Sequence, residues 1–544
     1  MDYEIVLLDV FDTAIHRNVA KPTDVFMLAQ ARMEKEWRYL PYAGQLSGFP
    51  KERAACERLG RRTINKELTL DEIYELLHVR TGLPLSILAE LKQLEIEIEI
   101  EISYADPETL ALFFEALNQG NEICFLSDMY LPGAVIRQIL EKCGYMGRFD
   151  VRVSCEERKS KHTGEVYKQF AGKKALMVGD NQHSDIKMAE QNGISARLFC
   201  SKEKIDNWLA EFLGMGIDTD DISASLAFGT ARRMAIERGD TSAGGFGFED
   251  YGRYIFGPFV FGYLMYIRNI LAQQKPDVTI LFARDMYLFD RLLDLEHKYA
   301  FLNRLTLIYP AFQDVNERFD QFPDADRLAY REYHKSAAQS RDITKKYIDS
   351  LVGDARKIAI VDIGWVGNIQ NSFSRLAQEY DGEHEIFGVY AKMSDALPFD
   401  PNQRIFSWLD GHKNEGWLWK GGVELLEFAL VAPYGTTLSI EERAGEWFPV
   451  LEESDADELE YRNKAAELQK GILDFIAFAQ TSISPEGFNS DYLCGTAWAD
   501  PFFRLVSDPS PAEASLFGAL THSHDADGKS GRKAMFEFWK FDTR

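Results

Sequence analysis

The sequence predicts an α/β protein made of two regions, each built around a parallel β-sheet covered by helices. The chain has 544 residues, too many for one ordinary core, because domains typically hold about 100–200 residues. Hydrophobic residues make up 46% of it, which indicates a folded chain rather than a disordered one. Short apolar runs that end in polar residues alternate with helical patterns, as they do in folds with parallel sheets.

The chain is strongly acidic. It contains 61 lysine and arginine residues against 86 aspartate and glutamate residues, which gives a net charge of −25. Such a surface repels phosphate backbones, so we expect no nucleic acid as a partner. The six cysteines are scattered without a Cys-x-x-Cys pair, which favours reduced thiols in a cytoplasm and no zinc site.

Neither a signal peptide nor a membrane span is expected. Met1–Glu4 lacks the basic and apolar regions of a signal peptide, so we expect a cytoplasmic protein. The most apolar window, Tyr254–Ile267, lies between Arg253 and Arg268 and is too short to cross a membrane. We expect it to be a buried helix.

The first predicted strand, Glu4–Asp9, is an apolar run that ends in a carboxylate. Two similar runs, Glu122–Ser127 and Lys174–Asp180, end in a hydroxyl and a carboxylate. Buried parallel strands have this composition, and open α/β sheets place their sites at the carboxyl ends of strands. We therefore expect one sheet with these three polar side chains along the same edge.

The segment between the first two strands is far longer than a crossover needs. Residues 15–104 contain helical patterns, one of them opened by the capping box Thr69–Glu72, so we expect a mostly helical cap inserted into the sheet domain. Residues 95–102 alternate glutamate with isoleucine, a period of two that is typical of a strand. A long helix ending near Ser103 is the competing interpretation, which we favour because Leu85–Leu94 is strongly helical.

The pattern of strands and helices restarts after Cys200. Helical segments are followed by two strand-like runs, Val278–Phe282 and Lys357–Asp362, each leading into a helix. We expect residues 1–204 to form the first α/β domain, cap included, and residues 205–544 to form a second α/β domain of unknown function.

Four short motifs follow one another in the first domain. They are Asp9-Val10-Phe11-Asp12-Thr13; Ser127; Lys161, six residues before Tyr167; and Gly179-Asp180, followed by Asp185-Ile186. In this order, with a long gap after the first, they resemble the four signature motifs of the haloacid dehalogenase-like (HAD) superfamily of hydrolases. The resemblance implies a Rossmann-like HAD sheet domain with an inserted helical cap.

The resemblance also implies a magnesium site. Asp9 would act as the nucleophile and bind Mg²⁺, because a carboxylate attacks an anionic phosphoryl group only when a cation neutralises the repulsion. Asp180 and the backbone carbonyl of Phe11 would complete the oxygen ligands. Asp185 would bind the ion directly, bind it through water, or orient Lys161.

Ser127 and Lys161 would hold the phosphoryl oxygens and the charge that develops on them. Three of the candidate residues also have a purely structural interpretation. Asp180 fits the N-cap of a helix, Ser127 fits a turn, and Lys161 fits a solvated charge. Asp9 is harder to explain in this way, because a buried strand end seldom carries an unused carboxylate.

One position departs from the family pattern. Phosphatases of the superfamily carry an aspartate two residues after the nucleophile, as general acid and base, and this chain has Phe11 there. Phe11 argues against ordinary phosphatase activity. Asp12, one residue later, is a candidate replacement, and the cap residues His16 and Arg17 are others.

Two further runs, Ser127–Pro132 and Phe282–Tyr287, widen the resemblance. They are similar to segments of predicted bacterial HAD hydrolases that have a long C-terminal extension. Such proteins are often encoded among surface-polysaccharide genes, which implies a role in polysaccharide biosynthesis.

The C-terminal region contains a candidate second site. Arg284 and Asp285 follow one predicted strand, and Asp362, Gly364 and Gly367 end or follow the other. A glycine-containing loop that opens a helix offers N–H groups to an anion, in loose similarity to a phosphoribosyltransferase. A structural turn with a buried Arg–Asp pair is the alternative, and we favour it because the acidic pair and Thr-Gly core of such a loop are missing.

Two functions follow from these motifs. The first is a Mg²⁺-dependent HAD-type hydrolase, a phosphatase acting through an aspartyl intermediate on a phosphorylated small molecule such as a sugar phosphate. The second is a weak or inactive HAD binding module, with the C-terminal domain acting as a transferase or scaffold. Because the cap and loops select the substrate in such architectures, the sequence specifies only its class.

Overall fold

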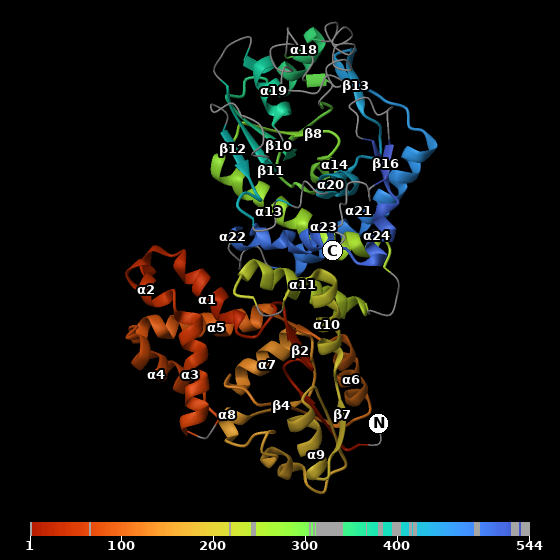
Figure 1. Ribbon diagram of the computed structural model, residues 1–544. Helices are drawn as coiled ribbons and strands as arrows, with labels where there is room; N and C mark the ends of the chain where they lie inside the picture. The colour runs from red at the N-terminus through yellow and green to blue at the C-terminus, as the bar shows by residue number, and fades with distance from the viewer. Residues whose placement is uncertain are drawn as a thin grey trace, which may run out of the picture. The chain divides into compact units, whose positions relative to one another are not determined.

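The computed structural model describes residues 3–64, 67–216, 219–240, 246–303, 306–307, 311, 341–365, 367–378, 384–393, 404–412, 416, 421–483, 490–523 and 532–534. The chain forms two compact units (Figure 1). Unit 1 comprises Met1–Gly245 and Phe478–Tyr492, and unit 2 comprises Phe246–Ala477 and Leu493–Arg544. Both contain a parallel sheet and helices, which confirms the predicted α/β class with a second α/β domain.

Unit 1 is built on five parallel strands in the order β5-β4-β1-β6-β7. They are β1 (Ile5–Asp9), β4 (Glu122–Ser127), β5 (Asp150–Val153), β6 (Ala175–Gly179) and β7 (Ser195–Leu198). Every residue of β1 and β6 is buried, as expected of central strands covered on both faces. The connecting helices are α6 (Pro107–Asn118), α7 (Gly133–Lys142), α8 (Ser154–Glu157) and α9 (Met188–Gln191), together with a 3₁₀ helix (Glu165–Phe170) and a π-helical segment (Gln182–Lys187).

The predicted cap is helical except at its two ends, where β2 (Ile15–Arg17) and β3 (Ser103–Ala105) pair as antiparallel strands. Between them lie α1 (Asp24–Glu34), a 3₁₀ helix (Trp37–Tyr42), α2 (Ala43–Leu46), α3 (Phe49–Ile64), α4 (Leu70–Thr81) and α5 (Leu85–Ile102), drawn in red and orange in Figure 1. The capping box at Thr69 is present, with both of its hydrogen bonds.

The helical interpretation of residues 95–102 is confirmed, because they form the end of α5. The buried residues there are Glu95, Ile98, Glu99 and Ile102, which lie on one face of a helix. Burial therefore follows the helical period, and the alternation of glutamate with isoleucine does not reflect a strand.

Unit 1 extends past the domain boundary predicted at residue 204. It includes α10 (Ser201–Leu213) and α11 (Ile222–Arg238). Gly229 lies against the chain at Asn18–Val19, where an added Cβ would be 2.4 Å from backbone atoms. The buried Arg232 pairs with Asp206 and donates 2.8 Å hydrogen bonds to the carbonyls of Val19 and Ala20. Because a buried guanidinium needs these acceptors, α11 packs with the preceding domain.

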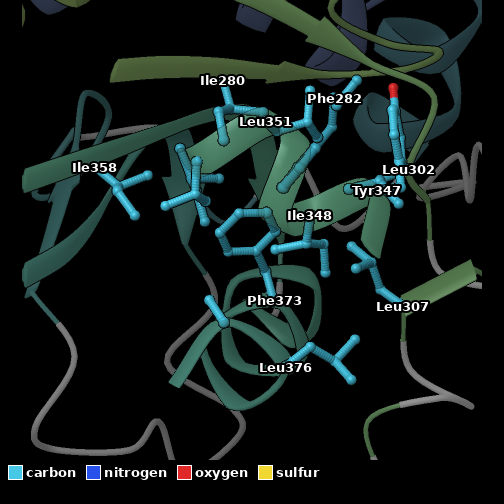
Figure 2. Close-up of a cluster of buried hydrophobic side chains, with 14 of the residues drawn as sticks. Ile280, Phe282, Leu302, Leu307, Tyr347, Ile348, Leu351, Ile358, Phe373 and Leu376 are labelled. Atoms are coloured by element: carbon cyan, nitrogen blue, oxygen red, sulfur yellow. The ribbon is translucent and has the colours of Figure 1, made fainter. Parts of the chain in front are cut away.

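Unit 2 has a second sheet of five parallel strands, in the order β12-β11-β10-β8-β9. They are β8 (Val278–Phe282), β9 (Lys298–Ala300), β10 (Lys357–Trp365), β11 (Glu385–Met393) and β12 (Arg404–Ser407). In chain order this is 2-1-3-4-5, so the direction of winding reverses between β8 and β10. The core beside this sheet includes Ile280, Phe282, Ile348, Ile358 and Phe373 (Figure 2).

The described helices of unit 2 include α12 (Phe248–Tyr251), a π-helical segment (Gly252–Phe256), α13 (Gly257–Gln274), α14 (Tyr287–Leu292), α18 (Arg341–Val352), α19 (Asn368–Gln378), α20 (Val423–Leu430), a 3₁₀ helix (Thr496–Ala499), α23 (Asp500–Ser507) and α24 (Pro511–Gly518). Two helices, α21 (Ala456–Ser482) and α22 (Ser490–Leu493), span the points where the chain passes between the units. Two hairpins are formed by β13 (Thr437–Arg443) with β14 (Glu446–Leu451) and β15 (Thr521–Ser523) with β16 (Arg532–Ala534).

The apolar helix of unit 2 is longer than predicted. It runs from Phe248 to Gln274, 27 residues, and is the one helix in the described part of the chain that is long and apolar enough to cross a membrane. The prediction that this segment is too short to cross a membrane is therefore wrong, because the helix is long enough. The expected burial holds, since 72% of its most apolar window is buried inside the protein, as in a core helix.

Candidate active site

Three strand ends of unit 1 bring the predicted polar residues together. Asp9 ends β1, Ser127 ends the neighbouring β4, and Asp180 follows β6 on the other side of β1. Because these strands are parallel, their carboxyl ends meet at one edge of the sheet. A pocket of about 360 Å³ opens there, and we call it the catalytic pocket. It is lined by Asp9, Phe11, Asp12, Arg17, Pro22, Thr23, Phe26, Glu57, Ser127, Asp128, Met129, Tyr130, Lys161, Asp180, Asn181, Ser184 and Asp185.

Three carboxylates that line this pocket are close enough to share one cation. Asp9, Asp180 and Asp185 each offer an oxygen, and the three oxygens lie within 4.8 Å of one another. Bonds of about 2.0–2.6 Å from one hard cation such as Mg²⁺ or Ca²⁺ would span such a group. Burial, followed by repulsion from Asp185 and Asp180, raises the pKa of Asp9 well above its ordinary value despite the nearby Lys161. An all-oxygen, mutually repelling donor set therefore fits the predicted magnesium ion.

Lys161 is a buried partner of two of these carboxylates. Its Nζ contacts Asp9 Oδ1 and lies 2.7 Å from Asp185 Oδ1. Only 4% of Lys161 is exposed, so the interpretation as a solvated charge does not hold. Burial alone would lower its pKa, but Asp9 and Asp185 raise the pKa of Lys161 well above its ordinary value. Asp128 holds this loop by accepting hydrogen bonds from the backbone N–H groups of Lys161 and His162.

The segment after β6 leaves Asp180 available to the pocket. Asn181, not Asp180, caps the π-helical segment, by accepting hydrogen bonds from the N–H groups of His183 and Ser184. The interpretation of Asp180 as a helix cap is therefore wrong. Asp180 is exposed, yet loss of solvation and repulsion from Asp12 and Asp185 still raise its pKa.

Glycine at position 179 makes room for Asp185. An added Cβ on Gly179 would lie 2.4 Å from the Asp185 carboxylate, so any other residue would displace it. Thr13 orients the carboxylate of Asp9 by donating a 3.0 Å hydrogen bond to its Oδ2. The Ser127 hydroxyl lines the pocket and makes no hydrogen bond to any described residue, so it can serve a ligand.

Phe11 occupies the position of the missing acid. The guanidinium of Arg17 stacks on its ring at 4.1 Å and forms a buried pair with Glu99, at 2.8 and 3.1 Å. The neighbouring Asp12 lines the pocket with a left-handed backbone (φ 63°) and lies 3.6 Å from Lys202. Although burial would raise it, Lys202 and Arg17 hold the pKa of Asp12 below its ordinary value.

His16 is not among the residues that line the pocket. It is fully buried and lies 3.1 Å from Asp106. Of the two cap residues considered as replacements for the acid, only Arg17 reaches the catalytic pocket, and its guanidinium is held by Glu99.

Apart from Arg17, sequence reasoning missed the residues that the cap contributes to the pocket, such as Phe26. Arg53 of α3 is fully buried, pairs with Glu95 at 2.7 Å, and lies over the rings of Phe26 and Tyr130 at 4.6 and 4.5 Å. Both rings line the catalytic pocket. The signal in the sequence was the isoleucine-rich run that contains Glu95, because a buried carboxylate requires a cation.

The candidate second site lies where the winding of the unit 2 sheet reverses. Arg284 and Asp285 follow β8, and Asp362 lies on the adjacent β10. Asp362 is 6% exposed, and burial together with Asp285 and Glu427 raises its pKa well above the ordinary value. Arg284 is half-buried and forms no ion pair with a described residue, so the alternative of a buried Arg–Asp pair is not seen in this part of the chain.

The glycines of this region allow backbone conformations and close contacts that a side chain would prevent. Gly364 has φ 117°, and an added Cβ would lie 2.2 Å from the carbonyl oxygen of Lys392 on β11. Gly367 also has a positive φ, of 65°, and is buried. Gly364 is thus required for close packing between strands, and its position does not depend on an anion.

Comparisons with known proteins found no matching family model and no matching curated protein. Solved structures similar to this chain include a hydrolase from Streptococcus pneumoniae TIGR4 (16% identity, TM-score 0.23, 37% of this chain and 94% of that one). L-2-haloacid dehalogenase from Xanthobacter autotrophicus is similar in two structures, one with chloropropionic acid covalently bound (15% identity, TM-score 0.27, 40% and 85%) and another (16%, 0.27, 40% and 84%). At these identities and TM-scores the likeness does not assign the chain to a family.

Proposed function

We propose that unit 1 is a Mg²⁺-dependent hydrolase of the HAD type, which cleaves a phosphate ester of a small molecule through an aspartyl intermediate. The observation that carries this proposal is that oxygens of Asp9, Asp180 and Asp185 lie within 4.8 Å of one another in the lining of one pocket, with Lys161 against two of these residues. A sugar phosphate in surface-polysaccharide synthesis is the substrate we favour.

Asp9, Asp180 and Asp185 would hold the magnesium ion, with the backbone carbonyl of Phe11 as a further ligand. Bound there, the ion would neutralise the repulsion between a carboxylate and an anionic phosphoryl group. The charge of this group supports magnesium binding, because its three carboxylates outnumber the single ammonium of Lys161.

Different residues of the catalytic pocket act as the nucleophile, orient it and stabilise the developing charge. A carboxylate oxygen of Asp9 attacks phosphorus, and the ester oxygen leaves with its bonding electrons. Water then attacks the phosphorus of the aspartyl phosphate, the bond from phosphorus to the Asp9 oxygen breaks, and inorganic phosphate leaves as the Asp9 carboxylate is restored. Thr13 orients Asp9 through its 3.0 Å hydrogen bond. Lys161 and the Ser127 hydroxyl stabilise the charge that develops on the phosphoryl oxygens.

Protonation of the leaving group is the weak step. Phe11 has no proton to give, and the lowered pKa of Asp12 keeps that carboxyl ionised at neutral pH. Esters whose leaving group needs little protonation are therefore preferred, and breakdown of the aspartyl intermediate is slow because its lowered pKa makes Asp12 a weak base.

A matched pair of substrates tests this proposal. With Mg²⁺, the full chain should hydrolyse p-nitrophenyl phosphate at least about 100-fold faster than an alkyl phosphate, since a placed acid contributes about 10²–10⁴. Chelation of the metal and Asp9→Asn should each abolish turnover. Rapid metal-independent release of chloride from 2-chloropropionate, without release of phosphate from any ester, would overturn the proposal.

The second hypothesis, a weak or inactive HAD module with the work done by unit 2, has one observation in its favour. Asp362 and Arg284 lie at the reversal of the unit 2 sheet, where open α/β sheets bind ligands. If it is correct, phosphate esters are turned over slowly or not at all, and a nucleotide sugar raises the melting temperature of the wild-type chain but not that of Asp362→Asn.

A further inference from the structure

A second pocket of about 440 Å³ adjoins the catalytic pocket within unit 1. Helices α1 and α3 of the cap form most of its lining, and Asp220, Ile222 and Tyr492 contribute to the rest. We call it the basic pocket, because three cations line it: Lys21, Lys51 and Arg58.

The cations of the basic pocket are in excess over its carboxylates. The one carboxylate in its lining is Asp220, which lies 3.5 Å from Lys21. Lys51 and Arg58 form no ion pair or hydrogen bond with any residue in the described ranges. Two other arginines of α3 are paired, since Arg53 contacts Glu95 and Arg61 contacts Glu57, whereas Arg62 is exposed and lines neither pocket. In a chain of net charge −25, two unpaired cations at one pocket indicate an anionic ligand.

The two pockets share a wall. Thr23, just before α1, lines both of them. Adjacent residues of each helix then line different pockets: Phe26 and Glu57 line the catalytic pocket, and Met27 and Arg58 line the basic pocket. A ligand that passes Thr23 would therefore have one end near the carboxylates of the sheet and the other beside the cations of α3.

We propose that the basic pocket binds a second anionic group, a phosphate or a carboxylate, of the substrate whose phosphoryl group is cleaved in the catalytic pocket. The substrate is then a phosphate ester with another anionic group, and Lys51 and Arg58 determine its specificity. Assignment to the substrate depends on the proposed function; binding of an anion at this pocket does not. The same chemistry would bind a free anion, and the experiment separates the two sources.

The kinetic test compares a bisphosphate with a monoester. For the double variant Lys51→Gln/Arg58→Gln, we expect KM for fructose 1,6-bisphosphate to rise at least about tenfold, because the variant removes two charge-assisted hydrogen bonds to the second phosphate. The kcat should stay unchanged, as should both constants for p-nitrophenyl phosphate, which confirms that the variant is folded. Arg62→Gln is the matched control, an exposed arginine of α3 that lines neither pocket.

A binding test keeps this inference separate from the proposed function. Pyrophosphate, titrated calorimetrically into the full chain with a chelator present, should bind wild type and Arg62→Gln equally and the double variant at least tenfold more weakly. This holds even if no ester is ever hydrolysed. Equal affinity in all three proteins, or no binding to wild type, overturns the anion site. Activation of p-nitrophenyl phosphate hydrolysis by pyrophosphate, lost in the double variant, overturns assignment to the substrate and assigns the pocket to a free anion.

Discussion

At the scale of single residues, the environment gives the same side chain different properties. Asp9 and Asp12 are three positions apart, yet burial and neighbouring carboxylates raise the pKa of Asp9, whereas Lys202 and Arg17 lower the pKa of Asp12. The first is a carboxylate that a metal ion would stabilise, and the second is a satisfied ion-pair partner. The position of Asp12 in the sequence suggested a replacement acid, and its charged neighbours argue against that role.

The first prediction tests this difference with Asp12→Asn. Asparagine tolerates the left-handed backbone at φ 63°, so the variant should fold normally. We expect kcat on p-nitrophenyl phosphate to change by less than about threefold, whereas loss of a true acid–base group costs about 10²–10⁴. Asp9→Asn is the inactive control. A loss of 100-fold or more in Asp12→Asn would show that Asp12 is the acid–base residue.

At the scale of elements, α5 shows what a sequence pattern predicts and what it leaves out. Its helical state followed from the preceding segment, and the alternation of glutamate with isoleucine pointed to a strand. The structure resolves the conflict, because Glu95 and Glu99 lie one turn apart on the buried face and pair with Arg53 and Arg17. These partners come from distant segments, so their identity was not predictable from local periodicity.

The second prediction concerns the pair of Arg17 and Glu99. Removing one partner of a buried ion pair leaves an uncompensated charge, which typically costs about 3–5 kcal/mol. We expect Glu99→Gln to lower the free energy of unfolding by about 2–4 kcal/mol, because glutamine still accepts one hydrogen bond. The double variant Arg17→Met/Glu99→Leu should lose less than Glu99→Gln alone. Urea unfolding of both variants measures this, and a larger loss of stability in the double variant than in Glu99→Gln would contradict it.

At the scale of the whole molecule, the sequence was sufficient to predict two parallel-sheet units and the edge at which Asp9, Ser127 and Asp180 meet. Neither Lys161 nor Asp185 is on a strand of that edge. Both were predicted to lie there only because the order of the four motifs resembles that of the HAD superfamily. The end of unit 1 beyond residue 204 and the pocket residues of the cap other than Arg17 could not be predicted, because they depend on long-range pairs such as that of Arg232 with Asp206. The strand order 2-1-3-4-5 of unit 2 likewise follows from pairing between distant segments.

In that strand order the buried Asp362 lies on β10, where the direction of winding reverses. Burying an ionised carboxylate there lowers the stability of the folded state. The raised pKa of Asp362 means that the folded state keeps a proton that the unfolded state releases near pH 4. In the window from about pH 4 up to the raised pKa, the folded state binds more protons, so stability falls as pH rises.

At the start of the same two strands, Asp277 accepts hydrogen bonds from the N–H groups of Lys357 and Arg356, which lower its pKa. Its contribution is present above about pH 4 and is lost as pH falls through the lowered pKa.

The third prediction uses these two residues as controls for each other. Asp362→Asn removes the charge and keeps the Oδ1 that accepts a 2.9 Å hydrogen bond from the Ile363 N–H. We expect its melting temperature to exceed that of wild type at pH 8, with the difference shrinking toward pH 4. Asp277→Asn should instead melt below wild type at pH 8, and this difference should shrink only as the pH falls below about 4, where the wild-type carboxylate protonates. Melting curves measured between pH 3 and pH 8 on the full chain give both trends. If Asp362→Asn melts below wild type at every pH, then the carboxylate stabilises unit 2 and Asp362 is a structural residue. If it melts above wild type, the chain retains a destabilising acid at the reversal of its sheet, as binding sites commonly do.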